Sequence, residues 1–227
     1  MATARALLTV AMLTGCPAER LGVPVPPRGV HAIQQEDLQR DVFHLLADGP
    51  LHPRHPDALA WVEQRLGQMN LEAISVPVEG VACALRQGSA QQAVLFVAPH
   101  ADAGAEATAL PDAALITLAK STDGLGTPRR SLLFCSVPQA ALPDLWSSPP
   151  SSWPSLDGTV IIRGLGGNTL SIDGPSAMES PSWELHTEQR ELAPTEDGME
   201  RLNYVRVAEH LRDVHARLLA PQFTPEG

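Results

Sequence analysis

The sequence is poor in aromatic residues and in cations, and each shortage removes a class of function. Aromatic residues make up 4% of the 227 residues, with a single Tyr, so the chain lacks the material for platforms that stack bases. It has 16 Lys and Arg against 26 Asp and Glu, a net charge of −10, and Lys120 is the only lysine. Nucleic-acid binding needs clustered cations, so no nucleic acid is expected as a partner.

Common nucleophile and thiolate motifs are also missing. There is no G-x-S-x-G elbow and no C-x-x-C pair, which argues against a serine hydrolase of that kind and against a thiolate zinc site. Cys83 and Cys135 each lie inside an apolar, strand-like run. The sequence leaves open whether they pair as a disulfide or stay as buried free thiols.

The first residues have the pattern of an export signal. Arg5 precedes an apolar run over 6–13, which is too short to span a bilayer, and the run ends in Leu-Thr-Gly-Cys16. This ending resembles the lipobox of bacterial lipoproteins, which implies a signal peptide over 1–15 and lipid on Cys16. We expect a proline-rich tether over 16–32 and an exported protein anchored in a bacterial membrane, at the outer membrane or its periplasmic face. The alternative is a short apolar N-terminus with a chance Gly-Cys.

The rest of the chain can bury a core, since 44% of all residues are hydrophobic and 19% are charged. We expect one domain over 33–221 and a tail over 222–227. Apolar periodicity and turn residues predict its elements. They are helices over 34–47 and 59–70, strands over 72–78, 81–86 and 93–98, a helix opening at Pro111-Asp112, a Pro/Ser/Trp-rich loop over 143–156 between strands over 131–137 and 158–162, and a last helix over 202–218.

Strand, helix and strand follow one another in the middle of the chain, which is the βαβ rhythm. The fold class expected is therefore α/β, a single three-layer domain with a mixed, mostly parallel sheet between helices. Asp197 and Glu200 have the spacing of a capping box before the last helix. The spacing of His210 and His215 does not put them on one helix face, so both are interpreted as surface residues.

Ligands of α/β sheets bind beyond the carboxyl ends of the strands, so the polar residues there are the candidates for chemistry. His100 and Asp102 directly follow the apolar run over 93–98. A ligating imidazole commonly donates its other N–H to a carboxylate, which Asp102 could supply. Asp112 is expected at a helix start, where the helix dipole favours a carboxylate in any case.

These residues resemble the zinc aminopeptidases of peptidase family twenty-eight, whose fold is shared with bacterial leucyl aminopeptidases and glutaminyl cyclases. In that family a strand ends in His-x-Asp and an Asp follows at a helix start, as His100, Asp102 and Asp112 do here. The segment from Trp183 to Thr187, with His186, resembles the family segment that holds the last metal ligand. The likeness runs from about 33 to 220 and implies the same fold.

The resemblance implies a pair of zinc ions that clamp a water and polarise a substrate carbonyl. His100, Asp112 and His186 would be metal ligands, with Asp112 as the bridge. Asp102 would be the catalytic carboxylate that orients an imidazole. The implied partners are a peptide or protein, together with a membrane through the lipid on Cys16.

The chain departs from the family where the other acids belong. After the strand that ends at Val137 the family carries Glu-Glu, its general base and a ligand, but this chain has Pro138, Gln139, Ala140 and Ala141. After the next strand the family places a ligand Asp, but here Arg163 and Gly164 follow Ile162. An arginine at this place would repel a cation. The acids that could substitute are Glu106, Glu179 and Glu184.

The sequence therefore predicts an exported zinc-exopeptidase-like protein whose two-zinc site is degraded, with little or no peptidase activity. One alternative is an active metal-dependent exopeptidase that holds a single zinc through His100, Asp112 and His186. The other is a binding module at the membrane surface.

Overall fold

The computed structural model describes residues 28–46, 55–100, 106–163, 165, 170–173, 182–187 and 203–223. Cys16, Asp102 and Glu179 lie outside the described residues, and so do the expected signal peptide and most of the expected tether. Asp197 and Glu200 of the expected capping box also lie outside them. Among the described residues no helix is both long and apolar enough to cross a membrane.

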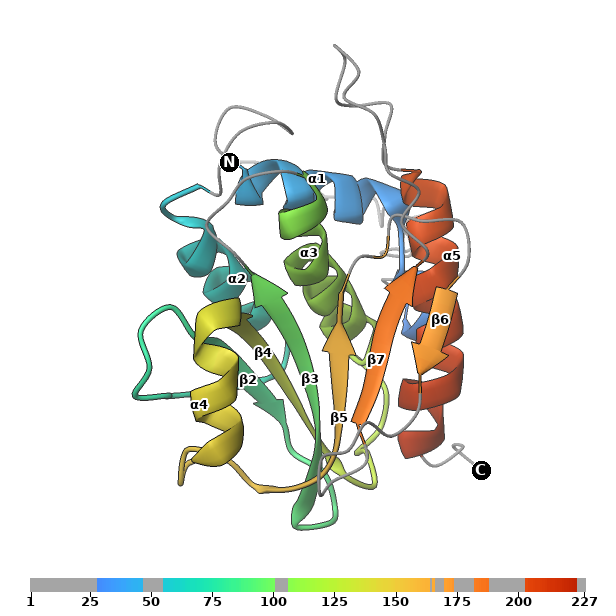
Figure 1. Cartoon of the computed structure of the whole chain (residues 1–227). Coiled ribbons are helices and arrows are strands. Elements are labelled where there is room, and N and C mark those ends of the chain that lie inside the picture. The colour runs from blue at the N-terminus through green and yellow to red at the C-terminus, as the bar shows by residue number, and fades with distance from the viewer. Residues whose placement is uncertain are drawn as a thin grey trace, which may run out of the picture.

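A sheet of seven strands in the order β1-β2-β4-β3-β5-β7-β6 forms the centre of the domain (Figure 1). The strands are β1 (Glu72–Ile74), β2 (Ala82–Arg86), β3 (Gln92–His100), β4 (Ser131–Pro138), β5 (Ser155–Ile162), β6 (Leu170–Asp173) and β7 (Ser182–Thr187). Strand β3 runs parallel to β4 and β5, and β5 runs parallel to β7. The β1–β2, β2–β4 and β6–β7 pairs are antiparallel, so the sheet is mixed.

Helices cover both faces of this sheet, which gives three layers (Figure 1). One face is covered by α1 (Gln35–Leu45), α2 (Ala58–Gly67), α3 (Glu106–Ser121) and α5 (Tyr204–Val214), which share a buried apolar cluster with the sheet. The short α4 (Leu142–Ser147) covers the other face, over a second cluster that includes Leu142, Leu145 and Trp153. The expected α/β domain with a mixed sheet between helices is thereby confirmed.

The central strand follows directly from its sequence. Residues 93–98 form a continuous apolar run, and all of them are buried, because helices and sheet neighbours cover the strand on both faces. Helix α1 buries Leu38, Val42 and Leu45, which recur at helical spacing. These two elements lie where the hydrophobic pattern predicts them.

Cys83 and Cys135 form a disulfide, which settles the question that the sequence leaves open. They lie directly opposite each other in the antiparallel β2–β4 pair, with Cα atoms 4.2 Å apart. The bridge therefore links the outer antiparallel strands to the parallel centre of the sheet.

Several element boundaries differ from the expectation. Helix α3 begins at Glu106, not at Pro111, and continues with Pro111 inside it. Helix α5 begins at Tyr204, and its N-cap is Asn203, whose side chain accepts a hydrogen bond from the Arg206 amide at 3.1 Å. The expected loop over 143–156 contains α4, and the first strand ends at Ile74.

Candidate functional site

The carboxyl ends of β3, β4, β5 and β7 lie at one edge of the sheet, because these four strands are parallel (Figure 1). In open α/β sheets this edge is where ligands bind. His100 is the last residue of β3, Gln139 directly follows β4, and Arg163 directly follows β5. His186 is the second-last residue of β7. The topology therefore brings the backbone positions of these predicted site residues to the same edge.

His100 is held at this edge by backbone. Its side chain is buried, with 7% of the residue exposed, and its Nε2 lies 3.2 Å from the carbonyl oxygen of Gly80. A carbonyl oxygen only accepts, so Nε2 must carry a hydrogen and donate it. A zinc ligand nitrogen instead offers a lone pair, and in this arrangement Nε2 has none to offer. His100 in this state does not fit a zinc ligand through Nε2.

Asp112 is the seventh residue of α3 and is fully buried, with 0% of the residue exposed. The expectation that Asp112 begins the helix was wrong, because the helix extends further toward the N-terminus through Glu106 and Ala107. The helix start, where the resemblance places an acid, is thus held by Glu106 and Ala107. The Glu106 side chain lies outside the described part of the chain.

The remaining predicted ligands stay predictions. The backbone of His186 pairs with Ser171 in the β6–β7 register, but its side chain and that of Glu184 are outside the description, as is all of Asp102. Within the described residues no three His, Cys, Asp or Glu side chains come together as a group that could hold a metal ion.

The residues that follow β4 and β5 also argue against a two-zinc centre. Gln139 and Ala140 lie exposed in a short 3-10 helix, η2 (Gln139–Ala141), and Arg163 is exposed after β5. The amide of Arg163 donates to the carbonyl of Leu185 in β7 at 2.9 Å. The backbone of Arg163 therefore continues the β5–β7 pairing at this edge. Two zinc ions bring four positive charges and need carboxylates here. The described residues therefore do not fit such a centre.

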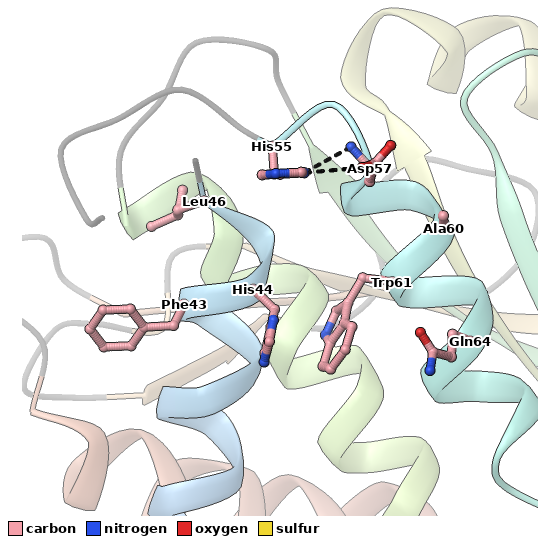
Figure 2. A pocket seen from close by; sticks show the side chains of 8 residues that line it. All are labelled: Phe43, His44, Leu46, His55, Asp57, Ala60, Trp61 and Gln64. Atoms are coloured by element: carbon pink, nitrogen blue, oxygen red, sulfur yellow. Dashed lines mark hydrogen bonds and ion pairs between the residues drawn. The ribbon is translucent and has the colours of Figure 1, made fainter. Parts of the chain in front are cut away.

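A hollow lies between α1 and α2, with a volume of about 340 Å³ (Figure 2). The rings of His44 and Trp61 line it and stack on each other, with centroids 3.9 Å apart and planes at 21°. Arg65 lies near the same indole, its Cζ 5.9 Å from the ring centroid. We call this hollow the α1–α2 groove; its lining residues are Phe43, His44, Leu46, His55, Asp57, Ala60, Trp61 and Gln64.

The turn histidine His55 is fixed at one end of the α1–α2 groove (Figure 2). Its Nδ1 accepts a hydrogen bond from the Asp57 amide at 3.0 Å and lies 3.8 Å from the Asp57 carboxylate. The sequence does not reveal this groove, because His44 and Trp61 come from different helices and neither belongs to a motif. Taken alone, each of the two residues fits an ordinary amphipathic helix.

His215 is buried rather than on the surface, with 5% of the residue exposed, so that interpretation was wrong. Its Nδ1 lies 2.8 Å from Ser121 Oγ, and the same hydroxyl donates to the carbonyl of Leu118 at 2.7 Å. The hydroxyl hydrogen is thus used, so the imidazole donates to Ser121. Burial lowers the pKa of His215 below its usual value. The pair lies at the end of α3 and is structural.

No family model and no curated protein matches the sequence. Solved structures do match in shape. The chain superimposes on the Tannerella forsythia glutaminyl cyclase with a TM-score of 0.57 and 10% identity, covering 87% of this chain and 100% of that one. The Bacteroides thetaiotaomicron glutaminyl cyclase bound to N-acetylhistamine gives 0.58 and 8%, covering 89% and 100%.

A Zn-dependent exopeptidase from Parabacteroides distasonis gives a TM-score of 0.55 at 10% identity, covering 85% of this chain and 99% of that one. At such identities the likeness establishes the fold and leaves activity open. The chain has the fold of the zinc-dependent exopeptidases and glutaminyl cyclases.

Proposed function

We propose that this chain is an exported, lipid-anchored protein of the zinc-exopeptidase fold that has little or no peptidase activity. The observation that carries the proposal is the composition of the carboxyl edge. The positions after β4 and β5 hold Gln139, Ala140 and Arg163, where a two-zinc centre needs carboxylates. The described residues at these positions supply neither a general base nor a ligand set of the required charge.

The export part of the proposal is supported by two separate features. Cys16 follows an apolar run in the order expected for lipid attachment. The Cys83–Cys135 disulfide is of a kind that persists in oxidising compartments and is rare where thiols are kept reduced. Labelling with a radioactive fatty acid, compared between the natural chain and Cys16→Ser, tests lipid attachment. Equal labelling of both would contradict it.

The catalytic part is tested on purified protein by elemental analysis and by two activity assays. We expect substoichiometric zinc, no release of N-terminal amino acids from peptides and no cyclisation of N-terminal glutamine. EDTA-sensitive turnover together with stoichiometric zinc would overturn the proposal. If both were lost in His100→Ala, a rearranged single-zinc site with His100, Asp112 and His186 would be the better description.

A binding module at the membrane surface is the second candidate function, and the α1–α2 groove is the observation that favours it. The groove joins an aromatic stack to the polar side chains of His55, Asp57 and Gln64, and pockets that bind ligands commonly combine these two features. A screen of short peptides by NMR tests this candidate. Shift changes confined to His44, Trp61 and their neighbours support it, and the absence of any shift there counts against it.

A further inference from the structure

The connection between β1 and β2, residues 75–81, runs along the carboxyl edge of the sheet, and we call it the strap. Strand β2 is antiparallel to β4, and its first residue, Ala82, pairs with Ser136 near the end of β4. The strap must therefore leave the sheet at the edge where β4 ends. Its residues Val76, Val78 and Val81 are partly buried against the apolar cluster beneath α4. These three side chains pack the strap onto the domain.

The strap contacts the site at His100. The carbonyl oxygen of Gly80 accepts a hydrogen bond from Nε2 of this buried histidine, at 3.2 Å. A divalent cation bound through Nε2, rather than through the other ring nitrogen Nδ1, would need the lone pair of the same nitrogen. The backbone of the strap and a cation thus compete for one atom.

The strap also contacts Pro138, the residue that pairs with His100 in the β3–β4 register. Gly80 has φ +79°, and a Cβ added there would lie 2.8 Å from Cγ of Pro138. Both the backbone conformation and the space therefore favour glycine at this position. Gly80 sits over the last residue pair of two neighbouring strands, where the candidate site would open.

Both ends of the strap are fastened. Ser152 donates from Oγ to the carbonyl of Ser75 at 2.9 Å, which ties the first strap residue to the turn before β5. Cys83, two residues after the strap, is bonded to Cys135 in β4. The strap is thus attached to the domain before, at and after Gly80.

We propose that the strap is an occlusion built into the fold, in which the Gly80 carbonyl takes the place at His100 Nε2 that a metal ion bound through this nitrogen would need. His100 is then a positioning residue that anchors the strap. The inference deepens the proposed function and rests on it, because a chain that held zinc through Nε2 of His100 could not keep this contact. The occlusion explains why the edge has His100, as the resemblance implies, although Gln139, Ala140 and Arg163 stand where the resemblance places acids.

The test is the reactivity of His100 toward diethylpyrocarbonate, followed by peptide mass spectrometry on the full chain. In the natural chain, His100 should react at least about tenfold more slowly than half-exposed His55, because reaction requires the strap to open. Gly80→Ala strains the strap and crowds Pro138, so the rate at His100 should rise by about tenfold while that at His55 stays unchanged. Gly67→Ala is the matched control, since a Cβ there meets nothing within 4 Å.

Ser152→Ala is the milder variant if Gly80→Ala does not fold. It removes one hydrogen bond to the strap, so the rate at His100 and amide exchange over 76–80 should rise by about two- to tenfold. Ser147→Ala is its control, because the Ser147 hydroxyl donates to the Asp144 carbonyl within α4 and Ser147 is exposed. If His100 reacts as fast as His55 in the natural chain, the proposed occlusion by the strap is wrong. Unchanged rates at His100 in folded Gly80→Ala or Ser152→Ala would contradict it as well.

Zinc content measured on the same proteins separates the two proposals. Zinc bound through His100 in the natural chain would overturn both. A reactive His100 without zinc would overturn the strap and leave the proposed function standing. A protected His100 in a chain whose peptidase activity depends on zinc held elsewhere would support the strap and overturn the proposed function.

Discussion

Asp41 on α1 and Arg65 on α2 form a two-pronged ion pair, with Nε 3.0 Å from Oδ1 and Nη2 3.3 Å from Oδ2. The Asp41 side chain is 1% exposed and that of Arg65 is 13% exposed, so the pair is nearly dry. It ties together the two helices that form the α1–α2 groove.

Replacing Arg65 alone should be costly, because the Asp41 carboxylate would stay buried with most of its compensation removed. We expect Arg65→Met to lower the free energy of unfolding by about 3–5 kcal/mol, and Asp41→Leu combined with Arg65→Met to recover most of that loss. Urea unfolding measures both. The exposed Arg217–Asp213 pair is the control, and Arg217→Met should cost no more than about 0.5 kcal/mol. Equal losses for the two single variants would contradict the role of burial.

Stability should depend on pH through His215. Its pKa is lowered by burial from an ordinary value of 6.5, so the unfolded chain takes up a proton at higher pH than the folded chain does. The contribution is fully present above about pH 6.5 and is lost as the pH falls toward the folded pKa. Chemical unfolding between about pH 8 and about pH 5 should show a steeper loss for the natural chain than for His215→Gln.

The same substitution at half-exposed His55 is the control for losing an imidazole as such. Parallel curves for the natural chain and His215→Gln would show that the buried ring does not couple folding to protonation. Ser121 is the partner in this pair, and its hydroxyl is committed to the Leu118 carbonyl.

The sequence predicted the parts of the fold that depend on long hydrophobic patterns. Strand β3 and helix α1 were expected nearly where they lie, and the carboxyl edge followed from the parallel strands. The start of α3 was missed because the run before Pro111 is rich in Ala, which gives no periodic signal. Proline is also favoured in the first turn of a helix, so Pro111 indicated a helix start there.

The site was less predictable than the fold, for a physical reason. The contact of His100 with Gly80 joins residues from separate elements, and so does the His44–Trp61 stack. Such contacts depend on how elements pack, and residue types along one stretch do not encode them. His215 was misjudged for the same reason, since Ser121, 94 residues away, supplies the partner that lets the ring be buried.

Gly88 should tolerate no side chain. A Cβ added there would lie 2.4 Å from both the carbonyl carbon of Arg130 and the amide nitrogen of Ser131, which are backbone atoms and cannot turn aside. We expect Gly88→Ala to lower the free energy of unfolding by about 1–3 kcal/mol. Gly126→Ala is the matched control, because a Cβ there meets nothing within 4 Å and should be neutral or slightly stabilising. Equal midpoints for the two variants would refute the overlap.

The Cys83–Cys135 disulfide should contribute strongly to stability, since it closes a loop with a sequence separation of 52. A loop of that length corresponds to about 4 kcal/mol of unfolding free energy in the chain-entropy model. Dithiothreitol should therefore shift the urea midpoint of the natural chain downward, while Cys83→Ala combined with Cys135→Ala should be insensitive to reductant. Thiol titration verifies that the bridge has been opened. If the midpoint stays in place after reduction has added two thiols to the count, the bridge does not stabilise the β2–β4 pair, and the sheet packing alone holds these strands together.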